Sequence, residues 1–430
     1  MSSNHHCNGR VAFVTGANGI TGNAIIDHLI RQPASQWHVK VFSETLRGFL
    51  LSSNRSKIVI TTRRVPKWPL WQDPRIRFIA LDFLKPVDEL VQLMRPLCHD
   101  VTHAFFASYV HEVDFAKLKD YNVPLFKNFL LATDQSSKSL TRVVLHTGGK
   151  NYGLHLGPVE VPVHEGMARY EDYGENFYYI QEDFMFDLAA KRGWQWNIVR
   201  PMGIIGYTPA VIKAKLNLRD LGNGMSMALT VAIYFLTCRE LGQVPMFPGN
   251  RFFYNAVDDA SYAPSVADLS VWASTHEHTK NEAFNHNNGD YIVWKYFWAR
   301  LGEHFGMEVP EIPDSAWTAS GEGQKMESQI KMAEWAKDKK SVWERVVAKH
   351  GGNPEAFDWA TWDILDWGLG EGWLAITTVN KARKFGWNRF DDTYDAWTET
   401  FRSFENAGVL PLTAPVEEKA KALRPHPGGR

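Results

Sequence analysis

Short apolar runs alternate with amphipathic segments along the first 150 residues and a little beyond. The apolar runs are rich in β-branched and aromatic side chains and predict buried strands, whereas the segments between them have the period of helices. Such alternation is typical of a parallel sheet with helices on both faces. The expected strands are residues 11–15, 57–61, 77–81, 101–107, 141–146 and 194–200, and the expected helices lie within residues 23–31, 87–94, 121–134 and 176–191.

The second strand has two candidates. Residues 38–42 (HVKVF) stand at the spacing of a compact βαβ unit, in which the second strand follows about thirty residues after the first. Residues 57–61 (KIVIT) come later but are followed by two arginines whose chemistry suits a cofactor site. We favour the later run, which makes residues 38–56 an insertion.

Beyond Tyr207 the pattern is mostly helical and rich in tryptophan, which we assign to packing because aromatic residues on helices are usually core. Residues 225–238 are the most apolar stretch, too short for a membrane span, and predict a buried helix; a membrane-surface role is the alternative. We therefore expect an α/β fold in which residues 1–206 form a Rossmann-type, doubly wound parallel sheet that binds NADP(H). Residues 207–413 would form a mainly helical substrate-capping region, and residues 414–430 a disordered tail.

Composition adds few constraints. The 430 residues are 44% hydrophobic and 22% charged, as in an ordinary folded protein of one large domain or two. A net charge of −1 gives no general attraction to nucleic acid or anionic lipid. Cys7, Cys98 and Cys238 have no short-range pairing pattern, which suits a reducing compartment and excludes a disulfide scaffold or dedicated zinc site. The first ten residues lack the apolar core of a signal peptide, so we expect a cytoplasmic protein. A homodimer is compatible with the sequence.

The first strand leads into a glycine-rich turn, since residues 11–22 read VAFVTGANGITG. Gly16 permits the tight turn, Gly19 lets the backbone approach a pyrophosphate, and Gly22 lets the following helix pack on the strand. The N–H groups at the start of that helix would face the phosphates. A strand before and a helix after the glycines are the context that predicts dinucleotide binding.

Arg63 and Arg64 directly follow the favoured second strand, where the adenosine ribose of a nicotinamide dinucleotide should lie. A carboxylate there would bond the free 2′-hydroxyl, whereas an arginine accommodates a 2′-phosphate through charge-assisted hydrogen bonds. The sequence therefore predicts NADP(H). Asp82 ends the third strand, at a position that commonly meets the adenine end of the dinucleotide.

The usual catalytic pair of such enzymes, a tyrosine followed four residues later by a lysine on one helix, is absent. Glu182 stands four residues after Tyr178. Asp183 stands four residues after Tyr179. Either the protein binds nucleotide without catalysis, as a sensor does, or the pair comes from two segments. Lys150 follows the fifth strand at the carboxyl edge and Tyr178 opens the next helix, so the two could converge.

Ordered motifs run from residue 11 to about residue 410: TGANGITG, TTRRVPKW, VTHAFFASY, VVLHTGGKNY, NFYYIQED, NIVRPMGIIGYTP and FNHNNGDYIVWKYFW. In this order they resemble the progesterone 5β-reductase and iridoid synthase family, atypical short-chain dehydrogenases that reduce activated C=C bonds with NADPH. The resemblance implies that Lys150 and Tyr178 are the catalytic pair. It also implies that Arg63 and Arg64 bind the cofactor phosphate.

Three features depart from the family pattern. Tyr109 stands where members commonly hold a tryptophan near the nicotinamide, and His146 replaces their glutamine. The insertion at residues 38–56 has no counterpart in the family. The first two departures leave the cofactor and the catalytic pair intact but put the family's substrates, steroids and monoterpene dialdehydes, in question. We expect a small apolar carbonyl compound of specialised metabolism, such as a terpenoid or polyketide enone.

The reaction implied is a 1,4-reduction, in which hydride passes from the nicotinamide to the β-carbon of an α,β-unsaturated carbonyl. Tyr178 would stabilise the enolate as an oxyanion-hole donor does, and Lys150 would hold the phenol. The alternatives are reduction of a simple ketone or oxidation of an alcohol by the same pair, or a non-catalytic NADPH sensor.

The remaining candidates surround this pair. Tyr109 and Tyr152, with Phe177, are expected to line the substrate pocket, whereas Thr147, Asn151 and His146 have either substrate contacts or roles within the loop. No metal is expected. The residues expected to bind NADP(H) are Thr15, Gly16, Asn18, Gly19, Ile20, Arg63, Arg64, Asp82, Phe83, Ala107, Tyr178 and Ile205.

Overall fold

A computed structural model describes residues 9–33, 36–37, 57–63, 71–112, 115–170, 174–209, 225–317 and 328–413. The expected insertion at 38–56, Arg64, Cys7 and the expected tail at 414–430 lie outside these ranges.

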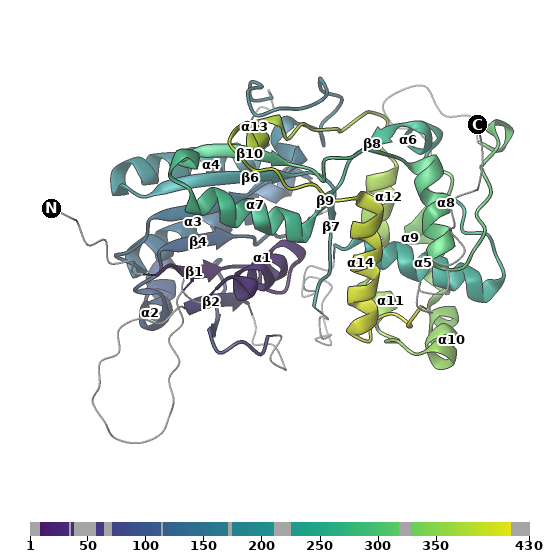
Figure 1. The fold of residues 1–430 in the computed structure, drawn as a ribbon, viewed down its shortest axis with the longest axis horizontal. Helices are drawn as coiled ribbons and strands as arrows, with labels where there is room; N and C mark the ends of the chain where they lie inside the picture. The colour runs from purple at the N-terminus through teal and green to yellow at the C-terminus, as the bar shows by residue number, and fades with distance from the viewer. Residues whose placement is uncertain are drawn as a thin grey trace, which may run out of the picture.

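A seven-stranded sheet with all neighbouring strands parallel forms one end of the molecule (Figure 1). Across the sheet the order is β10-β6-β5-β4-β1-β2-β3. The order reverses between β1 and β4, and the carboxyl ends of these two strands mark the crevice where ligands bind in such sheets. The bounds are β1 (Val11–Val14), β2 (Lys57–Thr62), β3 (Ile76–Ala80), β4 (His103–Phe106), β5 (Arg142–His146), β6 (Gln195–Pro201) and β10 (Glu282–His286).

The six predicted strands are confirmed, and β2 is the later of the two candidate runs. The sequence pattern did not predict β10, because Asn285 and His286 give this run the polar character of a loop although both are fully buried. Since β10 pairs with β6, the predicted boundary at residue 206 does not contain the whole sheet.

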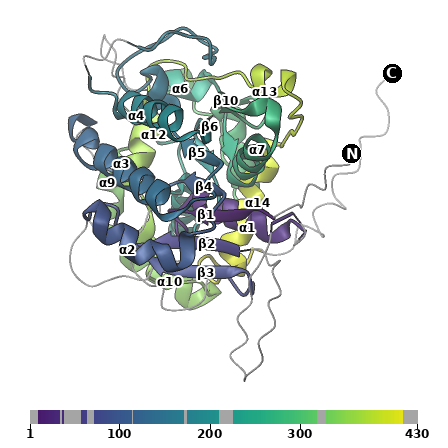
Figure 2. The same ribbon diagram turned by 90° about the vertical axis from the view of Figure 1, so that its left-hand side faces the viewer.

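Helices cover both faces of the sheet (Figure 2). Along β1 the side chains alternate between the two faces, as a strand requires. Phe13 packs in the core beneath one group of helices, and Val14 in the core beneath the other. The first group is α2 (Val87–Cys98), α3 (Leu118–Ser136) and α4 (Phe177–Arg192), and the second is α1 (Ile20–Arg31) and α7 (Ala263–Thr275).

A mainly helical region forms the other end of the molecule (Figure 1). Its central helix, α5 (Met227–Leu241), is buried over almost its whole length, which confirms the buried helix predicted there. Trp298, Trp343 and Trp397 lie fully buried in the same core. The other helices are α6 (Arg251–Asn255), α8 (Trp294–His304), α9 (Met332–Trp335), α10 (Lys340–His350), α11 (Ala356–Trp359), α12 (Trp362–Leu369) and α14 (Thr393–Asn406), with α13 (Asn380–Lys384) beside β10.

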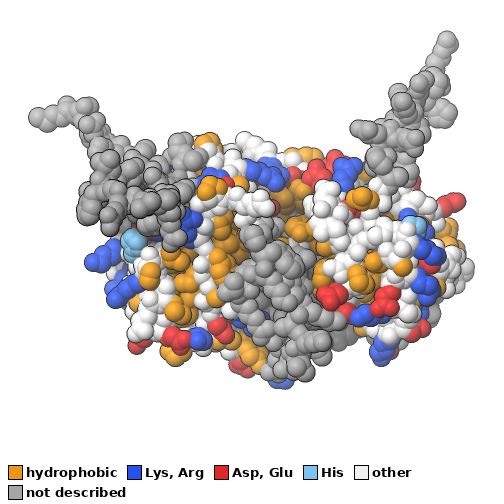
Figure 3. All heavy atoms as spheres, turned by 90° about the horizontal axis from the view of Figure 1, so that it is seen from below, with side chains coloured by type: hydrophobic (Ala, Val, Ile, Leu, Met, Phe, Trp, Pro, Cys, Tyr) orange, Lys and Arg blue, Asp and Glu red, His pale blue; other side chains and the backbone are white. Residues whose placement is uncertain are grey.

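Short strand pairs connect the two ends. These are β7 (Ile204–Ile205) with β9 (Ser261–Tyr262), and β8 (Val257–Asp258) with β11 (Ile292–Val293). Among the described helices, none combines the length and apolar character needed to cross a membrane. The lower face carries basic and acidic side chains interspersed with apolar ones at both ends (Figure 3).

The turn after β1 requires glycine at two positions. Gly16 has a φ of 62°, and a Cβ added there would lie 2.4 Å from the backbone oxygen of Ala107. A Cβ on Gly22 would lie 2.1 Å from the backbone oxygen of Gly16, so only glycine lets α1 begin so close to the turn. At Gly19 the nearest atom would be 3.2 Å away, which leaves this position open on its other sides.

Two histidines connect α7 to the sheet, His103 buried and His146 partly buried. A ring nitrogen of His103 lies 3.2 Å from the backbone oxygen of Ser274. His146 lies 2.8 Å from the Ser270 hydroxyl and 3.0 Å from the backbone oxygen of Phe106. Burial lowers the pKa of His103 to about 3 and that of His146 to about 4, so both rings are neutral near pH 7.

Acidification should therefore destabilise the protein. The usual histidine pKa of 6.5 applies to the unfolded chain, which binds more protons than the folded protein below that pH. Each buried histidine should cost up to about 1.4 kcal/mol of unfolding free energy per pH unit between pH 6.5 and its folded pKa. Thermal melts between pH 7 and pH 5 should show a weaker dependence for His146→Gln. The exposed His99→Gln is the control, and an unchanged slope for His146→Gln would contradict a neutral buried ring.

The glycine turn makes a second prediction. Gly16→Ala should combine a left-handed backbone, which costs about 1–2 kcal/mol for a side-chain-bearing residue, with the clash against Ala107. Gly193 also has a positive φ, of 87°, but a Cβ there would meet nothing within 4 Å. Gly193→Ala should therefore cost only the backbone strain. Denaturant unfolding of the two variants measures the difference, and equal losses would show that the close approach to Ala107 does not matter.

Candidate active site

The predicted cofactor residues of β1 and β4 meet at the carboxyl edge of the sheet. The backbone N–H of Thr15 donates to Phe105 (3.0 Å), and the Thr15 hydroxyl accepts a bond from the N–H of Ala107 (3.0 Å). Gly16 lies against Ala107 as described above. Thr15, Gly16 and Ala107 are therefore brought together where the strand order reverses.

The start of α1 lies beside the segment that contains Ile205. Gly19 is the N-cap residue of α1 and no side chain caps the helix, so its first N–H groups stay available to an anion. A Cβ on Gly206 would lie 2.7 Å from Cγ2 of Ile20, which brings the neighbouring Ile205 to the glycine turn. Asn18 is half-buried in the turn itself.

The other cofactor candidates lie beyond β2 and β3. Arg63 is exposed directly after β2. Asp82 accepts a hydrogen bond from the N–H of Leu84 (3.1 Å) within its own loop. The Phe83 ring is 3% exposed and packs edge-on against Phe129 in the sheet core. Cofactor contacts by these residues stay predictions.

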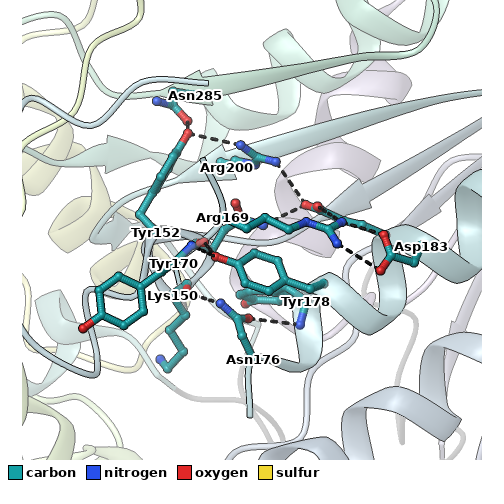
Figure 4. A network of polar contacts seen from close by, with 12 residues as sticks. Lys150, Tyr152, Arg169, Tyr170, Asn176, Tyr178, Asp183, Arg200 and Asn285 are labelled. Atoms are coloured by element: carbon teal, nitrogen blue, oxygen red, sulfur yellow. Dashed lines mark hydrogen bonds and ion pairs between the residues drawn. The ribbon is translucent and has the colours of Figure 1, made fainter. Parts of the chain in front are cut away.

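Lys150 and Tyr178 come from two segments that meet at one residue, Asn176 (Figure 4). Asn176 is the N-cap of α4, and its side-chain oxygen accepts a hydrogen bond from the N–H of Tyr178 (3.2 Å). Its side-chain nitrogen donates to the backbone oxygen of Lys150 (2.7 Å), in the turn that follows β5. The predicted convergence of the two segments is therefore present.

The Lys150 side chain meets the helical region. Its ammonium lies 4.9 Å from the centre of the Trp367 ring, on α12. Burial lowers the pKa of Lys150 to about 8, and the carboxylate of Glu371 opposes that shift. Burial in turn raises the pKa of Glu371 to about 7, against the effect of the lysine. The site is thus closed by residues far from the sheet in sequence.

Aromatic rings surround Tyr178. Its ring centre lies 4.2 Å from that of Phe177, which lies 6.2 Å from that of Tyr109. Burial raises the pKa of Tyr178, and the neighbouring Tyr109 adds to the shift. The phenol of Tyr178 is therefore protonated near neutral pH and able to donate a hydrogen bond.

Tyr152 lies on the other side of the loop from the lysine ammonium. It is 5% exposed, and its hydroxyl donates to the side-chain oxygen of Asn285 (2.5 Å) and accepts from Arg200 (3.3 Å). Figure 4 shows the Tyr152 hydroxyl and the Lys150 ammonium pointing in opposite directions. The structure thus gives Tyr152 structural contacts, and its role in a substrate pocket stays a prediction.

Sequence reasoning missed several residues of the site. Asn176 could have been identified from the sequence, because asparagine directly before a predicted helix is a favoured N-cap. Glu182 had one too, since it occupies the expected lysine position; it accepts hydrogen bonds from Asn151 (2.7 Å) and Arg200 (3.1 Å). Trp367 had none, being one of 17 tryptophans.

The sequence left two roles open for His146, Thr147 and Asn151, contact with substrate or a structural role in the loop. His146 has a structural role, since it forms hydrogen bonds within the sheet and to α7. Asn151 bonds Glu182 through its side chain. Thr147 differs, because its hydroxyl is buried and has no hydrogen-bond partner within the part of the chain that the structure describes.

Comparisons with known proteins show the family and the fold. A family model described as a PRISE-like Rossmann-fold domain matches residues 12–411. The short chain dehydrogenase gsfE of Penicillium aethiopicum is 39% identical, over 94% of this chain and 99% of that protein. An (S)-8-oxocitronellyl enol synthase of Nepeta cataria is 30% identical, over 92% of each chain.

Solved structures share the fold at low sequence identity. The Bordetella bronchiseptica enzyme WbmH, in complex with NAD+, has a TM-score of 0.57 and 14% identity, over 93% of this chain and 100% of that one. UDP-glucose 4-epimerase of Thermotoga maritima has a TM-score of 0.58 and 13% identity, over 92% and 99%. The fold is thus the Rossmann fold of nicotinamide cofactor-binding proteins. The chain belongs to the PRISE-like Rossmann-fold family and is an enzyme of the short-chain dehydrogenase/reductase class.

Proposed function

We propose that this enzyme is an NADPH-dependent reductase of α,β-unsaturated carbonyl compounds. The observation that carries the proposal is the pair of hydrogen bonds by which Asn176 joins the segments of Lys150 and Tyr178. These segments lie at the carboxyl edge of the sheet, where doubly wound folds bind their ligands.

The relatives support this reaction class. The Nepeta protein is named as an enol synthase, and an enol is the protonated form of the enolate that hydride addition to an enone or enal produces. The Penicillium protein is named as a short chain dehydrogenase. Both match this chain over nearly its whole length.

The glycine turn and the uncapped start of α1 fit the pyrophosphate of a dinucleotide. The Thr147 hydroxyl, directly after β5, is buried and has no partner among the described residues, which fits a polar group of a ligand bound at that edge. Arg63, with Arg64 after it, would bind the 2′-phosphate that distinguishes NADPH.

In the mechanism, bound NADPH supplies the hydride for the β-carbon of the substrate. Tyr178 donates its hydroxyl proton in a hydrogen bond to the carbonyl oxygen, and its raised pKa keeps the phenol protonated until charge develops there. Lys150, charged at pH 7, stabilises the negative charge that the phenol then shares. Tyr109 and Trp367 would provide apolar surface for a small carbonyl substrate, such as a terpenoid or polyketide enone, whereas Phe177 is buried in the core beside Tyr109. The cytoplasmic location and the homodimer stay predictions.

Loss of the phenol tests the mechanism. Tyr178→Phe should lower kcat about a hundred- to a thousand-fold, because losing one oxyanion-hole donor costs about 2.7–4 kcal/mol. The measurement is NADPH consumption with a panel of enones and ketones, and Tyr296→Phe, at an exposed ring, is the control. Unchanged turnover of every acceptor would refute the catalytic role. Loss of activity on ketones alone would favour ketone reduction.

Loss of the arginine tests cofactor choice. Arg63→Ala should raise KM for NADPH about tenfold, since a hydrogen bond to a charged group contributes about 1.5–3 kcal/mol and this one is exposed. KM for NADH should not change, because NADH lacks the 2′-phosphate. Arg95→Ala, at an exposed position of α2, is the control. Equal changes for both cofactors would contradict the proposed contact.

A further inference from the structure

One face of α4 holds the loop that carries Lys150. Asn176, Tyr179 and Glu182 follow one another at intervals of three residues, so they lie along one side of the helix. Each of the three forms a hydrogen bond with one of two consecutive loop residues, Lys150 or Asn151. Asn176 donates to the backbone oxygen of Lys150 (2.7 Å), and the Tyr179 hydroxyl donates to that of Asn151 (2.5 Å).

Glu182 makes the third of these contacts, with the side chain of Asn151 (2.7 Å). Its carboxylate is 2% exposed, a depth at which a charge is retained only when it is paired. Arg200 donates to one carboxylate oxygen (3.1 Å) and Arg169 to the other (3.3 Å). Figure 4 labels two partners of this network, Arg169 and Arg200, the second of which lies at the end of β6.

Arg200 connects Glu182 to Tyr152, the second residue after Lys150. It donates to the Tyr152 hydroxyl (3.3 Å) while it pairs with Glu182. Tyr152 is bonded to Asn285 of β10 as well (2.5 Å). The three residues 150–152 are therefore fixed at successive positions, and Glu182 is linked to the two residues that follow Lys150, directly to Asn151 and through Arg200 to Tyr152.

We propose that Glu182 is a positioning residue for Lys150 and acts through Asn151. In enzymes with a tyrosine and lysine four residues apart, the helix itself carries the lysine beside the tyrosine. Here the helix position four residues after Tyr178 carries a carboxylate, and it holds the loop that supplies the lysine instead. The inference rests on the proposed function, in which Lys150 and Tyr178 act together.

A displacement of Lys150 should lower kcat, because catalytic groups must be held within about 0.5 Å of their productive geometry. A displacement of about 1 Å can cost a hundred-fold in rate. Losing one of several bonds that hold the loop should cost less, and we expect Asn151→Ala to lower kcat about tenfold with little change in the affinity for NADPH.

The test compares three single variants. Asn151→Ala removes the link and leaves the Glu182–Arg200 pair intact. Glu182→Gln keeps an acceptor oxygen for Asn151 and should retain more activity than Asn151→Ala. Asp183→Asn is the matched control, since the next carboxylate along α4 is exposed and bonds only Arg169 among these residues.

The pH profile of kcat is the readout that a merely structural role would not move. Deprotonation of Lys150 should end activity in the intact enzyme above about pH 8. In Asn151→Ala this alkaline limb should shift by at least half a pH unit, because the ammonium changes surroundings, whereas Asp183→Asn should leave it in place. An unmoved limb in a folded Asn151→Ala would overturn the inference.

A double-mutant cycle with Lys150→Met provides the second readout. If Asn151 acts through the lysine, Asn151→Ala should lower kcat in the native background and have no further effect on Lys150→Met. An equal loss in both backgrounds would overturn the positioning role and leave the proposed function standing. Full activity of Lys150→Met would instead refute the catalytic pair, and with it both proposals.

Discussion

A single amide side chain fixes the geometry on which the proposed chemistry depends. Asn176 uses its oxygen to cap α4 and its nitrogen to hold the backbone of Lys150, and it is 1% exposed. An amide is suited to this place because its oxygen accepts while its nitrogen donates, whereas the carboxylate of aspartate, another good N-cap, can only accept. The start of α4 and the turn after β5 are therefore held together, with the tyrosine on one side of the amide and the lysine on the other.

The helical region completes the site and does not merely cover it. Trp367 and Glu371 reach Lys150 from α12 and the turn after it. That turn is fixed from another element, because the side chain of Asn250 donates to the backbone oxygens of Gly370 (2.8 Å) and Glu371 (2.9 Å). The environment of the lysine, and so its lowered pKa, is set jointly by the sheet and by α12. Changes in the helical region should therefore alter the charge state of the site as well as its shape.

The sequence predicted what depends on local pattern. Strand periodicity and the glycine turn were enough to predict six strands of the sheet, and the absent lysine spacing led to the prediction that the segments carrying Lys150 and Tyr178 meet. It did not predict β10, whose Asn285 is buried because Tyr152, Glu165 and Thr377 satisfy it from distant segments. It also did not predict Trp367, because nothing local distinguishes a ring that meets a lysine from one that packs in a core. Contacts between segments more than a hundred residues apart produce no periodic pattern in the sequence from which they could be predicted.

The exchange of lysine for glutamate on α4 is part of a wider arrangement of charge. Arg200, at the end of β6, lies 3.1 Å from the Glu182 carboxylate and is itself nearly buried. A lysine at position 182 would face this guanidinium in a site of low dielectric, where two like charges repel strongly. The helix glutamate and Arg200 therefore form one ion pair, while the ammonium of Lys150 lies apart from it, beside Trp367. Glu182→Lys alone would break that pair and leave Arg200 facing a second cation, so a lysine at this helix position would require a different residue in place of Arg200.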